Sequence, residues 1–173
     1  GSEMCIRDSN TAVFAWSDYT AFDSIEPIAE PFIIENEING CPVTAIETGA
    51  FSNAPLTEII LPDSIEFIDK LAFSTCRNLK KINFPENLKY LGTRAFVGCS
   101  SLNDIEIDCP KLEILRDTFC DCSALTSAKL NVKAIGESAF DSCSKLKNIS
   151  FGESVTRLGE SAFKNCEKLE TIV

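Results

Sequence analysis

A unit of 21–23 residues recurs along this chain of 173 residues, and phenylalanine marks it. The six marker positions are Phe51, Phe73, Phe96, Phe119, Phe140 and Phe163. Alanine precedes five of them. Three residues after five of them comes a cysteine, at Cys76, Cys99, Cys122, Cys143 and Cys166. Chance does not hold so many positions in phase, so the chain is built from one repeated structural unit.

Such a unit is too small to bury its apolar residues alone, and stacking neighbouring units would bury them in continuous rows. The Leu-x-x-Ile-x-Leu part of each copy alternates like a short strand, which predicts a parallel β-sheet on one face. The Ala-Phe-x-x-Cys part has the i, i+3 spacing of a short helical, 3₁₀ or irregular segment. A second apolar pair precedes the next Ala-Phe, for example Leu88 with Leu91 and Leu112 with Leu115.

The pattern L-x-x-I-x-[IL]-P-x-x-[LV]-x-x-I-G-x-x-A-F-x-x-C over residues 43–173 resembles the BspA-type leucine-rich repeat. This resemblance implies a right-handed leucine-rich-repeat coil of about six repeats. It also implies a cell-surface or secreted bacterial protein that adheres to host or neighbouring-cell proteins. Copy four departs from the pattern at Thr118, Cys120 and Ala128, which affects only its local packing.

The two ends of the chain read differently from the repeats. Residues 1–9 resemble a vector scar followed by the translation of a sequencing adaptor, with an ordinary disordered N-terminus as the alternative. Residues 10–42 are interpreted as an N-terminal cap on the first coil, the alternative being an aromatic ligand site around Trp16 and Tyr19. We expect the array, 43–173, to be truncated at its C-terminus, and the open last coil to allow end-to-end self-association.

Composition excludes several classes of function. The formal net charge is −10, and clustered basic residues would be needed for a nucleic-acid partner. No apolar run approaches the 18 or so residues that span a membrane. Histidine is absent, which removes His-dependent nucleophiles and His metal ligands. We therefore expect no enzyme, no metal and no cofactor.

The nine cysteines raise the question of zinc or disulfides. Only Cys120-x-Cys122 is a close pair, which is too little for zinc. Ala54 stands at the first position of the cysteine row, so this row accepts a small apolar residue and its thiols are expected to be buried and inert. A single bridge that involves Cys41, Cys109 or Cys120 stays open.

The outward positions of the predicted strands are the candidate protein-binding residues, because they differ from copy to copy. They are Glu58, Ile60, Lys81, Asn83, Asp104, Glu106, Ser127, Lys129, Asn148 and Ser150. A solenoid presents such a face as an extended surface suited to a protein ligand. The two functions under consideration are a protein-binding module of an adhesin and a structural spacer that presents another domain.

Thiol chemistry tests the interpretation of the cysteines. If the cysteine row is part of the core, a thiol assay on the unfolded, unreduced protein should find nearly all nine thiols free. Several missing thiols would contradict this interpretation, because disulfides would then hold the coils together.

Overall fold

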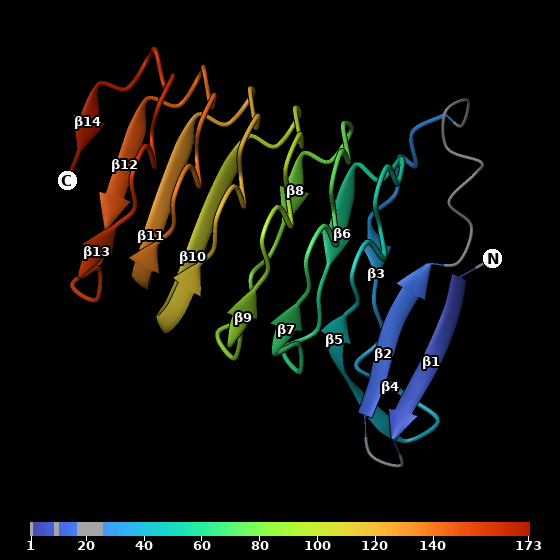
Figure 1. Ribbon diagram of the computed structural model, residues 1–173. Coiled ribbons are helices and arrows are strands. Elements are labelled where there is room, and N and C mark those ends of the chain that lie inside the picture. Colours follow the sequence, from blue (N-terminus) through green and yellow to red (C-terminus); the bar gives the residue numbers. More distant parts are fainter. Residues whose placement is uncertain (1, 9–10, 17–25) are drawn as a thin grey trace.

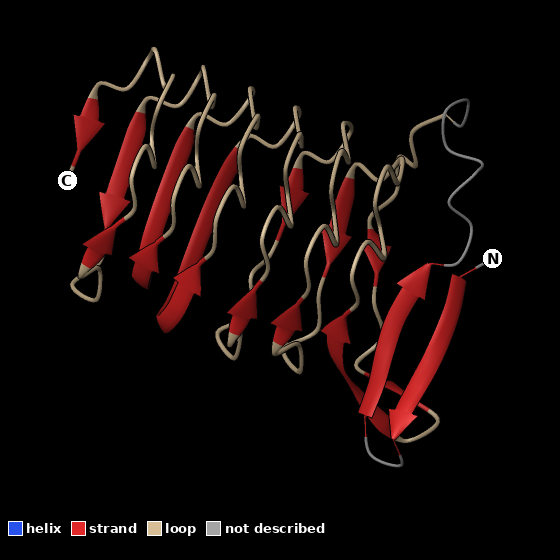
Figure 2. Cartoon of the chain, in the orientation of Figure 1, coloured by secondary structure: helices blue, strands red, loops and turns tan. Residues whose placement is uncertain are grey.

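The structure is a computed structural model that describes residues 2–8, 11–16 and 26–173. The chain winds as a solenoid in which each coil stacks on the preceding one (Figure 1). Throughout the described residues, strands are joined by turns and no helix occurs (Figure 2). The predicted repeat solenoid is confirmed, and the side that could have been helical, 3₁₀ or irregular consists of irregular turns.

A first row of parallel strands is formed by the Leu-x-x-Ile-x-Leu segments. It contains β3 (Phe32–Ile33), β6 (Glu58–Ile60), β8 (Lys81–Ile82), the first halves of β10 (Asp104–Ile114) and β11 (Ser127–Ile135), β12 (Asn148–Phe151) and β14 (Thr171–Ile172). The inward residues Ile59, Ile105 and Ile149 are buried, as the alternation of the sequence predicts.

A second row of strands, which the sequence showed only as an apolar pair, precedes each Ala-Phe. It contains β5 (Cys41–Ile46), β7 (Phe67–Ile68), β9 (Tyr90–Leu91), the second halves of β10 and β11, and β13 (Arg157–Leu158). The predicted pair of Leu112 with Leu115 is wrong. Because β10 continues as a strand, its inward residues are two apart, so Leu112 and Ile114 are buried and Leu115 is half-buried.

The N-terminal strands extend the second row. β1 (Ser2–Asp8) pairs antiparallel with β2 (Thr11–Trp16), which pairs parallel with β5. β4 (Glu37–Ile38) pairs with β5 across a two-residue turn, in which Asn39 and Gly40 both have positive φ, at 51° and 77°. β1 includes most of residues 1–9, which are predicted to derive from a vector scar and a sequencing adaptor. That prediction concerns the origin of these residues and not their conformation.

Residues 26–42 lie against the first coil. The Ile28 N–H donates to the Pro55 carbonyl at 2.8 Å, and Ile34 is buried in the core. These contacts support our proposal that residues 10–42 cap the array. Tyr19 lies outside the described residues, so the alternative of an aromatic ligand site around Trp16 and Tyr19 stays a prediction.

The Ala-Phe segment is held by backbone hydrogen bonds of two alternating kinds. The Phe51 N–H donates to the Ala72 carbonyl of the next coil at 2.7 Å, and the Ala50 N–H donates within its own turn to Glu47 at 3.1 Å. The same alternation repeats around Phe73. Every second amide in this segment is therefore used to join two coils, as in a sheet, and a helix would leave none for that purpose.

Two residues with positive φ flank each marker phenylalanine, two positions before and two positions after it. They are Gly49 and Asn53, Leu71 and Thr75, Arg94 and Gly98, Asp117 and Asp121, Ser138 and Ser142, and Ser161 and Asn165. A left-handed residue interrupts a 3₁₀ or α-helix, which explains why the i, i+3 spacing produces separate turns here.

The marker phenylalanines form one continuous stack through the core. Centroids of successive rings are 4.9–5.3 Å apart, and their planes lie within 3–16° of parallel. All are fully buried except Phe163, which is half-buried in the last coil. The four inner rings each contact a marker ring on both sides, so the stack links the coils in the same direction as the hydrogen bonds.

Removal of one ring from this stack should destabilise the whole array. We expect Phe140→Ala to lower the free energy of unfolding by about 3–5 kcal/mol, because it empties a fully buried aromatic site. Urea denaturation measures this loss. The control is Phe67→Ala, whose ring is 40% exposed and should cost less than about 1 kcal/mol. Equal losses in the two variants would show that the stack is not the core.

Candidate functional site

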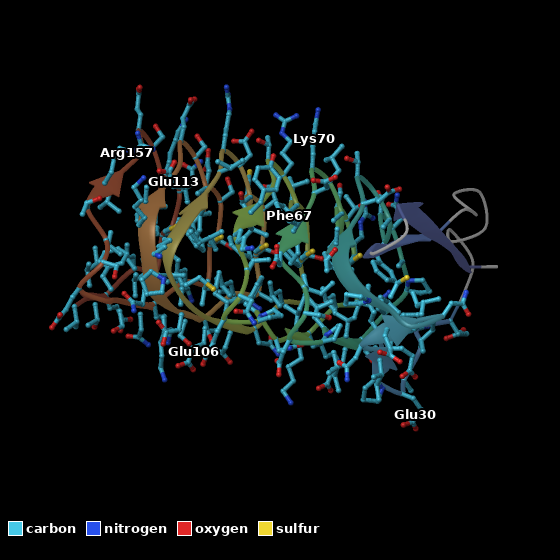
Figure 3. The ribbon with its side chains drawn as sticks, turned by 90° about the horizontal axis from the view of Figure 1, so that it is seen from below. Glu30, Phe67, Lys70, Glu106, Glu113 and Arg157 are labelled. Carbon is cyan, nitrogen blue, oxygen red and sulfur yellow. The ribbon has the colours of Figure 1, made fainter. Side chains whose placement is uncertain are left out.

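The strand face is the outward side of the first strand row, formed by the ten predicted binding residues. Strand register arranges them in two lengthwise rows, of which Asp104, Ser127 and Asn148 form part of one and Glu106, Lys129 and Ser150 part of the other. Eight of the ten are exposed, and Glu58 and Ser127 are half-buried. Glu106 lies on the opposite side of the solenoid from Phe67 and Lys70 (Figure 3).

Several side chains of the strand face contact one another across the coils. The Lys81 Nζ lies 3.5 Å from a Glu58 carboxylate oxygen, and the Lys129 Nζ lies 3.6 Å from Glu106. Exposed pairs of this kind contribute at most about 1 kcal/mol, so they can rearrange when a partner binds.

Hydroxyl groups hold Asp104 in a fixed position on this face. Its carboxylate accepts hydrogen bonds from the Thr126 hydroxyl at 2.9 Å and from the Ser127 hydroxyl at 2.7 Å.

Asn83 has a structural role that its sequence position does not indicate. Its side-chain oxygen accepts a hydrogen bond from the Leu61 N–H at 2.7 Å, and its amide group donates to the Leu61 carbonyl at 2.8 Å. The side chain therefore takes the place of a backbone partner for the preceding coil. Of the ten predicted residues, Asn83 is the one whose polar group already makes both hydrogen bonds with main chain.

A hollow of about 640 Å³ opens in the strand face between β8 and β10. Its walls are formed by Lys80, Lys81, Ile82, Asn83, Phe84, Asn103, Asp104, Ile105, Glu106, Ser127 and Lys129. The structure thus brings six of the ten predicted residues around one depression.

A smaller hollow of about 220 Å³ continues along the strand face and includes Asp108 and Asn131. The ten predicted residues do not include these two, because the apolar alternation of the sequence predicts strands that end two positions earlier. The Asn131 side chain donates to the Asp108 carboxylate at 2.7 Å. Proline does not signal the strand length here, because the long β10 includes Pro110 and β12, in a copy without proline, ends at Phe151.

Exposed apolar side chains form three further groups. Ile33 and Ile60 are in register on the strand face, at 62% and 38% exposure. Phe67 and Tyr90 are in register on the second strand row, at 40% and 37% exposure. At the last coil Leu158, Ile172 and Val173 are exposed. End-to-end self-association through that coil stays a prediction.

The thiols of the cysteine row donate hydrogen bonds to backbone carbonyls, which a small apolar residue such as alanine could not do. The Cys76 thiol donates to the Phe51 carbonyl at 2.9 Å, and the Cys99 thiol donates to the Phe73 carbonyl at 3.1 Å. Cys122, Cys143 and Cys166 repeat this bond one coil at a time. No disulfide joins any two of the eight cysteines from Cys41 to Cys166.

Burial raises the pKa of these thiols. The pKa of Cys76 rises from 9.0 to about 12, and a hydrogen bond from the Ala54 backbone opposes the shift only in part. Burial also raises the pKa of Cys99 well above its ordinary value, with the neighbouring thiols of Cys122 and Cys76 adding to the effect. Thiols of this kind remain protonated near neutral pH and do not act as nucleophiles.

The departure of copy four at Thr118 is satisfied locally. The Thr118 side chain is fully buried, and its hydroxyl donates to the Leu115 carbonyl at 2.8 Å. Ala128, in place of the usual isoleucine, is also buried. Both residues serve packing, which agrees with the expectation that only local structure changes in this copy.

Across the described segments, no group of three or more His, Cys, Asp or Glu side chains is arranged to hold a metal ion. In the same segments, no helix is long and apolar enough to cross a membrane.

The coils stack with parallel strands, and the phenylalanine rings stack through the core. Leucine and isoleucine recur at the same spacing from copy to copy. Together these features define a leucine-rich repeat solenoid. A family model described as the BspA type Leucine rich repeat region matches six copies over residues 44–171. The chain belongs to this family. A search of curated protein sequences found no match.

Solved structures with the same fold include the leucine-rich repeat protein TpLRR of T. pallidum, with 21% identity and a TM-score of 0.63 over 99% of this chain and 67% of that one. A leucine-rich cell surface protein of Faecalibacterium prausnitzii has 22% identity and a TM-score of 0.69, over 99% of this chain and 52% of that one. The pneumococcal vaccine antigen PcpA has 18% identity and a TM-score of 0.51, over 95% of this chain and 45% of that one. At these identities the likeness concerns the fold, and this chain spans about two thirds of the first protein and about half of the other two.

The buried thiols should make the stability of the fold depend on pH in the alkaline range. A folded-state pKa that is raised from 9.0 to about 12 leaves stability intact below pH 9 and removes it as the pH rises toward 12. The free energy of unfolding should fall between pH 8 and pH 10 in both proteins. The fall should be roughly 1 kcal/mol smaller in Cys76→Ala than in the unmodified protein, because the variant lacks this thiol. Urea denaturation at both pH values measures this, and identical losses would mean that Cys76 ionises normally in the folded state.

Proposed function

We propose that this chain is a non-enzymatic protein-binding module whose strand face contacts the partner. The observation that carries the proposal is a contrast between two sets of positions. Inward residues repeat from coil to coil, because they must fill the same core, whereas outward residues of the strand face change in charge, size and polarity. A surface that varies over a constant scaffold suits recognition of another macromolecule.

The physical character of the face favours a protein as the partner. Acidic, basic, amide and hydroxyl groups alternate along it, and exposed Ile33 and Ile60 add an apolar area at one end. Protein interfaces combine an apolar part with polar groups around it. A nucleic acid would require a basic stripe, which a face holding Glu58, Asp104 and Glu106 does not offer.

We further propose that the protein acts at the bacterial cell surface or after secretion, as part of an adhesin that contacts host or neighbouring-cell proteins. One structural relative is described as a cell surface protein and another as a vaccine antigen, which supports such a location.

The second candidate function is a structural spacer that presents another domain. A solenoid suits this role because its coils stack along one axis (Figure 1). A spacer needs no binding surface, so the two functions differ in what happens when the strand face is altered.

Charge reversal on the strand face separates the two functions. The test variant combines Lys81→Glu, Asp104→Lys and Lys129→Glu, and the probe is a panel of purified extracellular-matrix and bacterial-surface proteins on a biosensor. We expect the unmodified chain to bind at least one panel member and the test variant to bind it at least about tenfold more weakly, because both charge and hydrogen bonding on the face change.

The control variant carries the same change in net charge elsewhere on the solenoid. It combines Lys70→Glu, Glu160→Lys and Lys164→Glu, all exposed residues of the turn segments. Binding should be unaffected in this control. If both variants bind like the unmodified chain, the strand face is not the binding site; if no panel member binds at all, the spacer function is favoured.

A further inference from the structure

The strand face contains one joint where neighbouring strands do not pair. β8 is the last strand of a three-stranded sheet ordered β3-β6-β8, and the next strand along the solenoid, β10, belongs to the other sheet. β10 is paired with β11 on its far side from Asp104 to Cys109. The edge of β10 that faces β8 is therefore an unpaired strand edge within an otherwise continuous face.

Hydrogen-bond distances at this joint show that the two coils diverge. The Asn103 N–H reaches the Lys80 carbonyl at 3.4 Å. The same bond measures 2.8 Å in the preceding coil, from Lys80 to Thr57, and 2.7 Å in the following coil, from Thr126 to Asn103.

Beyond this stretched bond, Phe84 lacks the main-chain bonds that its counterparts in the last coils make, whereas its counterpart Leu61 bonds to the Asn83 side chain instead. In the last coils the Phe151 N–H donates to the Val173 carbonyl at 2.7 Å, and the Leu130 carbonyl accepts from the Gly152 N–H at 2.9 Å. In the described part of the chain, neither the N–H nor the carbonyl of Phe84 has the equivalent bond to β10.

The opening is confined to the strand face. On the turn side of the same two coils, the Phe73 N–H donates to the Ala95 carbonyl at 2.7 Å, and the rings of Phe73 and Phe96 stack at 4.9 Å. The hollow of about 640 Å³ lies over this joint and extends across β10 to Ser127 and Lys129 of β11, and we call it the β8–β10 notch.

The side chain of Phe84 accounts for the notch. Its position is occupied by the fully buried Leu61 and Leu130 in two other coils and by Phe151 in a third. The joint beside Phe151 is paired, and among the described rings Phe151 contacts Phe163 alone. The Phe84 ring is only half-buried and lies edge-on to two rings of the stack, 5.5 Å from Phe96 and 6.1 Å from Phe119. A ring that reaches two successive coils occupies the space into which β8 and β10 would otherwise close.

The chemistry of the notch specifies its occupant. Backbone N–H and carbonyl groups on a strand edge are matched by those of another extended chain, as in strand addition. The notch is lined by three lysines, Lys80, Lys81 and Lys129, and by two acids, Asp104 and Glu106.

Both acids already have partners, whereas Lys80 is exposed and has no ion pair among the described residues. The partners of Asp104 are uncharged hydroxyl groups, and Lys81 and Lys129 are paired with Glu58 and Glu106. Lys80 is therefore the lysine of the notch that is left to meet a carboxylate of a bound segment.

We propose that the β8–β10 notch binds an extended acidic peptide segment of a partner protein, whose main chain pairs with Phe84 and whose carboxylate meets Lys80. This inference rests on the proposed function and names the part of the strand face that makes the primary contact. The apolar floor of Ile82 and Phe84 receives one side chain of the peptide, and the remaining strand face surrounds this contact.

The test begins with a displayed library of unconstrained nine-residue peptides, selected against the full chain. We expect the enriched peptides to contain acidic residues and to protect the Phe84 amide from hydrogen exchange, since that amide is unpaired in the free protein. N-methylation at alternate peptide positions should abolish binding, because it removes the main-chain donors without changing the charge.

Two pairs of variants sharpen the test. Phe84→Leu should let β8 and β10 pair and weaken the selected peptides by about tenfold or more, whereas Phe151→Leu should leave their affinity within about twofold. Lys80→Glu should weaken them similarly, whereas Lys147→Glu should not, because Lys147 holds the equivalent position beside a paired joint. If Phe84→Leu does not fold, the lysine pair and the N-methylated peptides still decide the question.

The outcomes distinguish this inference from the proposed function. Peptides that protect strand-face amides only between β11 and β14 would overturn the notch and leave the strand face as the binding surface. Peptides that protect only the turn segments would contradict both. If no peptide is enriched over a selection against Phe84→Leu, the notch inference fails, while the charge-reversal experiment on folded proteins still tests the strand face independently.

Discussion

Every coil of this protein depends on hydrogen bonds to the next coil, because no coil can close a core by itself. The marker phenylalanines lie in a segment where alternate backbone amides donate to the following coil and the others close local turns. The stacked rings then fill the space that these turns enclose, at centroid distances near 5 Å. The backbone hydrogen bonds and the stacked rings therefore both join each coil to the next. The loss of a hydrogen bond or of a ring in one coil weakens the packing of the neighbouring coils as well.

The features that distinguish this chain occur where the repetition is interrupted. The ring of Phe84, which lies edge-on to two rings of the stack, stands at the notch. The continuous β10 and β11 extend the strand face to Asp108 and Asn131. A perfectly regular solenoid would pair all of its strands and expose only side chains. Each irregularity makes backbone groups or additional side chains accessible, which is why recognition is proposed at such a place.

The cysteine row shows the limit of arguments from spacing. A position that accepts alanine or cysteine was interpreted as one that requires a small apolar residue, and burial agrees with this. The structure adds that each thiol donates to the carbonyl of a marker phenylalanine in the preceding coil. Sequence cannot reveal this bond, since the acceptor belongs to the backbone of a different copy, and its position depends on how far each coil advances.

The repeat period, the inward residues and the outward residues could all be read from the order of amino acids, because apolar periodicity directly reflects which side chains are buried. Turn conformation could not, since Leu71, Thr75 and Arg94 adopt positive φ only because the neighbouring coils hold their amides there. Asn83 was assigned to the solvent face but bonds to the backbone of Leu61. Whether two adjacent strands pair or separate depends on the fit of side chains across the joint, and that fit exists only once the coils are stacked.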